Sequence, residues 1–135
     1  QNTSIYAHLA LMYNRMDLDN PKATCITARA EEAVADRRES YDIATSRAVA
    51  RLNILLELTA PYVKVGGRVI AMKGMAAREE LEECSNAIKK LGLKLEDVRE
   101  FPVDGTNHAL IVLRKVAHTP TAYPRRYAKI KQTPL

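Results

Sequence analysis

A nearly unbroken apolar run, RVIAM at residues 68–72, follows the pair Gly66-Gly67. Antiparallel strands with one wet face alternate apolar and polar residues, whereas the strands of a parallel sheet are covered on both faces and read as continuous apolar runs. The run therefore predicts a central strand, covered on both faces, in an open α/β sheet. The glycine pair predicts a turn before it.

A helical pattern comes first in the chain. Ile5, Leu9, Met12 and Met16 are spaced at i, i+4, i+7 and i+11, which is the apolar stripe of a helix that ends before Pro21. We therefore expect the first element to be a helix.

Strand and helix patterns then alternate as an α/β sheet requires. Residues 23–27 and 40–46 predict two strands, and residues 48–59 predict a helix that Pro61 ends or kinks. Residues 76–91 predict a further helix, with acidic residues early, Lys89 and Lys90 late, and Gly92 as its cap.

Residues 95–103 and 109–116 are two strand-like runs separated by Asp104-Gly105-Thr106-Asn107, which predicts an antiparallel hairpin at a sheet edge. In open α/β sheets ligands bind outside the carboxyl ends of the strands. The candidate site residues are therefore those that follow strands, at 29–32, 46–51 and 73–74.

Charge is unevenly distributed along the 135 residues, a length that suits one domain. All 16 acidic residues and 15 of the 21 basic ones lie at or before Asp104, so that part carries one net negative charge. The remaining basic residues lie in an acid-free segment and are Arg114, Lys115, Arg125, Arg126, Lys129 and Lys131. This asymmetry fits either a polyanionic partner such as nucleic acid or a merely solvated tail.

Cysteine and histidine do not indicate a metal or redox site. Cys25 and Cys84 are far apart and lie in apolar patterns, so we expect buried free thiols. His8, His108 and His118 lack ligand spacing, which disfavours a metal site. No apolar stretch approaches the length of a membrane helix, so we expect a cytoplasmic protein.

Three segments resemble one known family. They are RAEE at residues 29–32, the stretch from Ser46 through SRAVARLN to AMKG at Gly74, and the ending from Thr119-Pro120 to Leu135. In this order they resemble the small-subunit (16S) ribosomal RNA guanine-N7 methyltransferases, historically called glucose-inhibited division protein B. The resemblance implies a class I methyltransferase sheet, S-adenosylmethionine as cofactor and small-subunit ribosomal RNA as partner.

The resemblance also assigns roles near the cofactor. It implies that Ala30 presents its backbone to the adenine and that Glu31 lies at the mouth of the adenosine pocket; without it, both residues read as an ordinary helix start. Arg47 would direct its donor fork at the cofactor or at the O6/N7 edge of the guanine. The alternative for Arg47 is a salt bridge to Glu57 or Asp42.

RNA contacts are expected outside that pocket. Arg51 is expected at the surface or on RNA, and Lys73 either on a phosphate or as a snorkelling side chain. We divide the chain into a domain, 1–116, and a basic tail, 117–135, whose Arg125, Arg126 and Lys129 are expected to contact phosphates. The alternative for the tail is an arm folded back onto its own domain, and both can hold together.

One feature departs from the family. The five glycines, at positions 66, 67, 74, 92 and 105, do not form a G-x-G-x-x-G loop, and the chain begins with Gln1. We therefore expect a truncated and inactive part of the enzyme that lacks its N-terminal strands. A non-catalytic RNA-binding α/β module is the second hypothesis, and a nicotinamide-dependent dehydrogenase is a weaker third.

Overall fold

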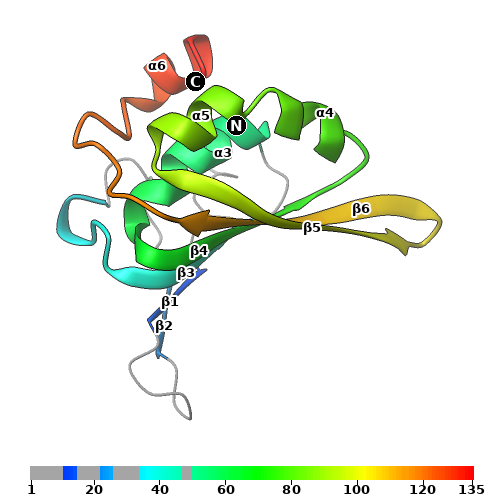
Figure 1. Cartoon of the computed structure of the whole chain (residues 1–135), viewed down its shortest axis with the longest axis horizontal. Helices are drawn as coiled ribbons and strands as arrows, with labels where there is room; N and C mark the ends of the chain where they lie inside the picture. Colours follow the sequence, from blue (N-terminus) through cyan, green and yellow to red (C-terminus); the bar gives the residue numbers. More distant parts are fainter. Residues whose placement is uncertain (1–10, 15–21, 26–33, 47–49) are drawn as a thin grey trace.

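The computed structural model describes residues 11–14, 22–25, 34–46 and 50–135. In this part of the chain a six-stranded sheet carries helices on one face (Figure 1). The strands are β1 (Leu11–Asn14), β2 (Lys22–Cys25), β3 (Tyr41–Ser46), β4 (Val63–Lys73), β5 (Leu93–Val103) and β6 (Thr106–Lys115). The helices are α3 (Leu52–Thr59), α4 (Ala77–Glu82), α5 (Ser85–Lys90) and α6 (Tyr127–Gln132), and two short 3-10 turns are η1 (Val34–Asp36) and η2 (Ala60–Tyr62).

The strand order is β2-β1-β3-β4-β6-β5. Strands β3 and β4 are parallel neighbours, whereas β6 is antiparallel to both β4 and β5. Asp104 and Gly105 join β5 to β6 with φ of 50° and 76°, the left-handed values that a two-residue hairpin turn uses. The open α/β sheet with a hairpin at its edge is confirmed.

The helix expected at the start of the chain is wrong at residues 11–14. These residues form β1, which pairs with β2 on one side and β3 on the other. Hydrogen-bonded ladders on both sides outweigh a helical stripe, of which only Met12 falls in this segment. Ile5, Leu9 and Met16 lie outside the described residues.

The turn expected at Gly66-Gly67 is also wrong, because β4 runs through it. Gly66 has φ of 94°, and the pairing of β3 with β4 shifts register between Tyr41 and Ile43, as at a β-bulge. A Cβ at Gly67 would lie 2.4 Å from the Asp42 carbonyl oxygen. The glycines therefore permit a bulge and a close strand approach.

Strand β4 is central, as predicted, but only one of its faces is fully buried. Val69 and Ala71 are each 1% exposed beneath the helices, whereas Met72 on the other face is 39% exposed. The apolar run therefore does not correspond to full cover on both faces.

The predicted helices are shorter in the structure. The helix expected at residues 76–91 divides into α4 and α5 at Cys84, and Gly92 follows α5 with φ of 79°. Helix α3 begins at Leu52 rather than at residue 48, and η2 follows it at Pro61 as expected.

Helix α3 packs on both of its sides. One side lies against the sheet in a core that includes Leu52, Leu56, Val69 and Ile111. The other side, with Leu58, joins a second core that contains Tyr62 of η2 and Ile130 of α6. Full burial of each leucine stabilises the fold by roughly 1.5 to 3 kcal/mol, so α3 is the centre of the helical layer.

The tail folds back onto the domain, which confirms the alternative of a returned arm. Ile130 of α6 is fully buried, and Leu135 packs against the main core. Arg38 donates to the carbonyl oxygens of Thr119 and Tyr123 at 3.0 and 2.7 Å. Residues 117–135 are therefore packed on the domain rather than extended from it.

Candidate functional site

The carboxyl ends of β3 and β4 lie side by side because the two strands are parallel. Strand β3 ends at Ser46 and β4 at Lys73. This is the edge at which open α/β sheets bind ligands. Two adjoining hollows lie along it, and they share Gly74 and Met75.

The larger hollow, here the Lys73 hollow, has a volume of about 390 Å³. It is lined by Ala50, Arg51, Lys73, Gly74, Met75, Ala76 and Glu80. Small-molecule sites in proteins typically enclose about 300 to 1,000 Å³. The hollow is therefore large enough for a small-molecule ligand.

A buried ion pair forms one wall of the Lys73 hollow. Lys73 is 5% exposed, and its Nζ donates to the Ala50 carbonyl oxygen at 2.7 Å and pairs with Glu80 Oε1 at 2.9 Å. The same Glu80 oxygen accepts the Leu52 backbone N–H at 2.8 Å. The side chain of Arg51, the N-cap residue of α3, makes no capping hydrogen bond. Glu80, from the neighbouring helix α4, therefore caps the first turn of α3 instead.

This pair fixes the segment after β3 relative to the end of β4. One ammonium and one carboxylate together hold the backbone of residues 50 and 52. Lys73 is therefore not a free cation at the surface, and this pairing disfavours the phosphate contact expected of it.

Arg51 lies at the rim of the same hollow. Its Nε and Nη2 donate to the Glu83 carboxylate at 3.1 and 2.7 Å, and about half of each side chain is exposed. The hydrogen bond from Glu83 raises the pKa of Arg51. This exposed pair keeps Arg51 at the surface, as the sequence predicts.

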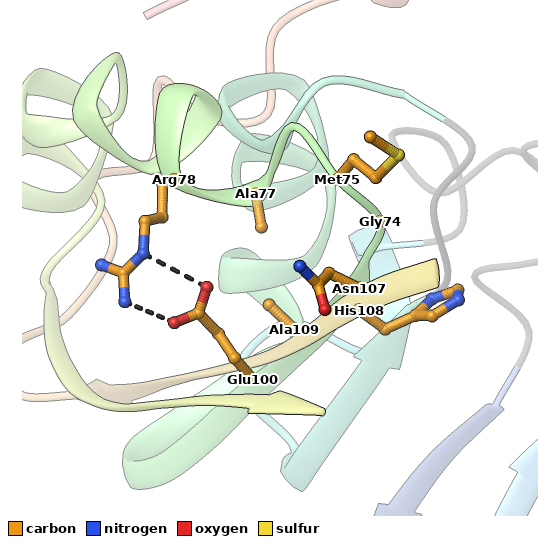
Figure 2. A pocket seen from close by; sticks show the side chains of 8 residues that line it. All are labelled: Gly74, Met75, Ala77, Arg78, Glu100, Asn107, His108 and Ala109. Carbon is orange, nitrogen blue, oxygen red and sulfur yellow. Dashed lines mark hydrogen bonds and ion pairs between the residues drawn. The ribbon is translucent and has the colours of Figure 1, made fainter. Parts of the chain in front are cut away.

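The smaller hollow, here the Glu100 hollow, has a volume of about 160 Å³ and lies between the start of α4 and the β5–β6 hairpin (Figure 2). It is lined by Gly74, Met75, Ala77, Arg78, Glu100, Asn107, His108 and Ala109. Arg78 Nε donates to Glu100 Oε2 at 3.2 Å, and Arg78 Nη2 donates to Oε1 of the same carboxylate. Figure 2 shows the Glu100 and Asn107 side chains facing the space beneath Ala77, whereas His108 points away.

Basic residues of the tail divide into paired and unpaired ones. Arg125 donates through Nε and Nη2 to Glu57 at 2.9 and 2.7 Å, and its backbone N–H reaches the same carboxylate at 2.8 Å. Glu57 is fully buried in α3, and its hydrogen bond raises the pKa of Arg125. Arg125 therefore anchors the tail through Glu57, and this pairing disfavours the RNA contact expected of it.

Arg126 and Lys129 are exposed, and within the described ranges neither side chain has a hydrogen bond or ion pair. Arg126 directly precedes α6 as its N-cap residue, and Lys129 lies in the middle of the helix. Of the tail residues that the sequence assigned to phosphates, these two present free cations to solvent.

Ala30, Glu31 and Arg47 lie outside the described residues, so their assigned roles stay predictions. Both acids named as alternative partners of Arg47 have basic neighbours elsewhere: Glu57 binds Arg125, and Asp42 lies 3.4 Å from Lys64. The carboxylates of Glu80 and Glu100 were missed by the sequence reasoning. Glu80 lies in an acidic run that was assigned to the helix dipole, and Glu100 lies in a strand without a distinguishing pattern.

Glu57 carried a usable signal. It is the one charged residue in the run LNILLELTA, and a charge inside an apolar stripe predicts a buried partner.

In the described part of the chain no three His, Cys, Asp or Glu residues gather as metal ligands, and no helix is long and apolar enough to cross a membrane. Cys84 is a buried free thiol, as predicted, and burial raises its pKa to about 12.

Solved methyltransferases share this fold. A ribosomal adenine-N1 methyltransferase variant from Catenulisporales acidiphilia with its cosubstrate has a TM-score of 0.52 at 13% identity, over 70% of this chain and 59% of that one. A Burkholderia thailandensis 1,6-didemethyltoxoflavin-N1-methyltransferase has a TM-score of 0.52 at 11% identity, over 68% of this chain and 50% of that one. At these identities the likeness concerns the fold, which is that of class I methyltransferases.

Sequence relatives are much closer. The Fervidobacterium nodosum ribosomal RNA small subunit methyltransferase G is 44% identical over 121 residues, 88% of this chain and 57% of that protein. The Clostridium kluyveri protein of the same name is 45% identical over 114 residues, 83% of this chain and 48% of that protein. The chain thus spans about half the length of the curated relatives it matches.

The family model described as rRNA small subunit methyltransferase G matches residues 6–109, which is more than half of the chain. This range includes every residue that lines the two hollows. The chain belongs to the rRNA small subunit methyltransferase G family.

Proposed function

We propose that the protein transfers a methyl group from S-adenosylmethionine to N7 of a guanine in small-subunit ribosomal RNA, in the cytoplasm. The observation that carries the proposal is the Lys73 hollow, which lies at the ligand-binding edge of the sheet in a member of this family.

The Lys73 hollow fits part of such a cofactor. Its volume lies in the range of small-molecule sites, and a Cβ at Gly74 would meet nothing within 4 Å, so a ligand can approach the backbone there. S-adenosylmethionine supplies the activated methyl group. The residues that would hold it are those around Ala50 and Gly74, together with Ala30, Glu31 and Arg47 by resemblance.

Methyl transfer to N7 does not depend on side chains that act as acids or bases. Guanine N7 carries an available lone pair, so its attack on a methyl group requires no general base. In-line positioning and exclusion of water supply the acceleration. Lys73 and Glu80 serve this purpose by holding the backbone of residues 50 and 52, and Arg47 would add a donor fork directed at the guanine or the cofactor.

RNA binding is assigned to the exposed cations. Arg51 lies at the rim of the Lys73 hollow, Arg126 is the N-cap residue of α6, and Lys129 lies within that helix. Their long side chains can reach phosphates, which fix orientation without reading sequence. Lys73 and Arg125 are left out because buried carboxylates already engage their charges.

A non-catalytic RNA-binding module is the second candidate. The absence of a G-x-G-x-x-G spacing among the five glycines of the sequence favours it. It would need the exposed cations of α6 but not the Lys73 hollow.

A chimera separates the two candidates. Residues 6–109 of this chain replace the matching region of the Fervidobacterium nodosum relative, and tritiated methyl transfer to unmodified small-subunit ribosomal RNA is measured. The 135-residue chain, the unaltered relative and the chimera with Arg47→Ala are run in parallel.

We expect the chimera to label guanine N7 and Arg47→Ala to reduce the rate by about 10² or more, as loss of an electrostatic donor does. The 135-residue chain is expected to transfer less methyl than the chimera. A folded chimera that binds the RNA but labels no guanine would reject the enzyme and leave the RNA-binding module.

A further inference from the structure

The Glu100 hollow carries polar groups that the proposed methyl transfer does not use. Its carboxylate comes from β5 and its amide from Asn107 of β6, and its lining includes Met75, which is 81% exposed. A flexible, exposed methionine suits contact with a flat ring.

The two polar groups differ in what they offer. Arg78 occupies one acceptor site on each Glu100 oxygen, and an ionised carboxylate has about four, so each oxygen keeps a further lone pair. The Asn107 side chain has no hydrogen-bond partner among the described residues, so its NH₂ donors are available. The hollow therefore presents two adjacent acceptors and a donor.

This set matches one edge of guanine. The Watson–Crick edge of guanine carries the N1–H and N2–H donors and the O6 acceptor. Adenine carries an acceptor at N1 instead, which a carboxylate repels. Recognition through the Watson–Crick edge leaves N7, the reacting atom, free.

We propose that the Glu100 hollow is a guanine-binding subsite, in which Glu100 accepts N1–H and N2–H and Asn107 donates to O6. Arg78 is a positioning residue that holds the Glu100 carboxylate in place through two hydrogen bonds. The choice of a nucleobase as ligand rests on the proposed function. The volume of the Glu100 hollow, about 160 Å³, suits one base rather than a whole nucleoside.

The test is equilibrium binding of GMP, IMP and AMP to the 135-residue chain, followed by NMR. The three ligands share the ribose and phosphate, so their differences report the base. IMP lacks only the N2 amino group, and a hydrogen bond to a charged group affects affinity by about tenfold. We therefore expect GMP to bind about tenfold more tightly than IMP, and AMP to bind more weakly than either.

Two variants divide the roles. Glu100→Gln should abolish the preference for GMP over IMP, whereas Asn107→Ala should weaken both ligands equally, because both carry O6. Asp97→Asn is the matched control, since it breaks another exposed arginine–carboxylate pair on β5 outside the hollow. It should leave all three affinities unchanged.

Equal binding of GMP and AMP, or a preference for GMP over IMP that survives in a folded Glu100→Gln variant, would overturn the subsite. Guanine selectivity without methyl transfer in the chimera would reject the proposed function alone. Methyl transfer that is indifferent to Glu100→Gln would reject the subsite alone.

Discussion

Lys73 and Lys115 end two neighbouring antiparallel strands, so they lie at opposite ends of the sheet. Both are buried and both pair with a glutamate, but their surroundings differ. Lys115 is fully buried and donates to the carbonyl oxygens of Ala60 and Val63 at 2.8 and 2.7 Å, and to Glu39 at 3.0 Å. Lys73 has two partners, Ala50 and Glu80.

The difference follows from the two ends of α3. Lys115 lies at the carboxyl end, where unpaired carbonyl groups and the helix dipole favour a cation. Lys73 lies at the amino end, where the dipole disfavours a cation and Glu80 must offset it. The interactions at the Lys115 end of the sheet therefore favour stability, whereas the end with the Lys73 hollow holds a buried charge at some cost in stability.

Lys115→Met should remove the interactions at the Lys115 end of the sheet and give the largest loss in the free energy of unfolding. It leaves two carbonyl oxygens without their donor and removes the cation that Glu39 faces. We expect a loss of about 3 to 5 kcal/mol in the free energy of unfolding, measured by urea denaturation. Arg114→Met, an exposed neighbour on β6, is the control. A loss no larger than that of the control would contradict the comparison.

Lys73→Met should cost less, about 1 to 3 kcal/mol, because Glu80 keeps its hydrogen bond from Leu52. The same urea denaturation measures it. Lys73→Arg, which keeps the charge, should recover part of the loss. If Lys73→Met proves as costly as Lys115→Met, the two ends are equivalent and the comparison fails.

The next largest effect is expected at low pH, where protonation of Glu39 should weaken the ion pair with Lys115. Partial burial by itself raises the pKa of Glu39, but hydrogen bonds from His118, Thr119 and Lys115 outweigh it and lower the pKa from 4.5 to about 2. A lowered pKa means that the stabilisation is complete above pH 4.5 and is lost as the pH falls toward 2. The difference in melting temperature between the wild type and Glu39→Gln should therefore shrink across this window; a constant difference would argue against the ion pair.

The smallest effect is expected at an exposed pair. Arg68 and Glu96 are joined at 2.6 Å, and Arg68 lowers the pKa of Glu96, yet both side chains are substantially exposed. Glu96→Gln should leave urea unfolding unchanged within error, because exposed ion pairs contribute little. A loss comparable to Lys73→Met would show that burial is not what separates these pairs.

The sequence indicated the parts of the fold that depend on local pattern. The strand at residues 41–46, the central strand and the hairpin at Asp104-Gly105 follow from apolar runs and turn residues. Strand β1 and the bulge at Gly66 could not be predicted, because both depend on pairing with strands distant in sequence. The split between α4 and α5 has no signal that we can identify.

The site was located by the same reasoning and incompletely described by it. Residues after β3 and β4 do border a hollow, as predicted for this edge. Their partners were invisible, since nothing local links Lys73 with Leu52 through Glu80. Likewise, the acid-free segment after Asp104 was consistent with either a polyanionic partner or solvent, yet Lys115 and Arg125 in this segment pair with acids of the domain.

The contact between Glu57 and Arg125 also has a consequence for synthesis. Arg125 follows Glu57 by 68 residues, so the helix that carries the acid leaves the ribosome well before its counter-ion. Until Arg125 has emerged, burial of Glu57 would leave an unpaired charge in an apolar layer, which is costly. Domains also generally fold as units during synthesis. The helical layer on α3 is therefore expected to close late in translation, when residue 125 has emerged.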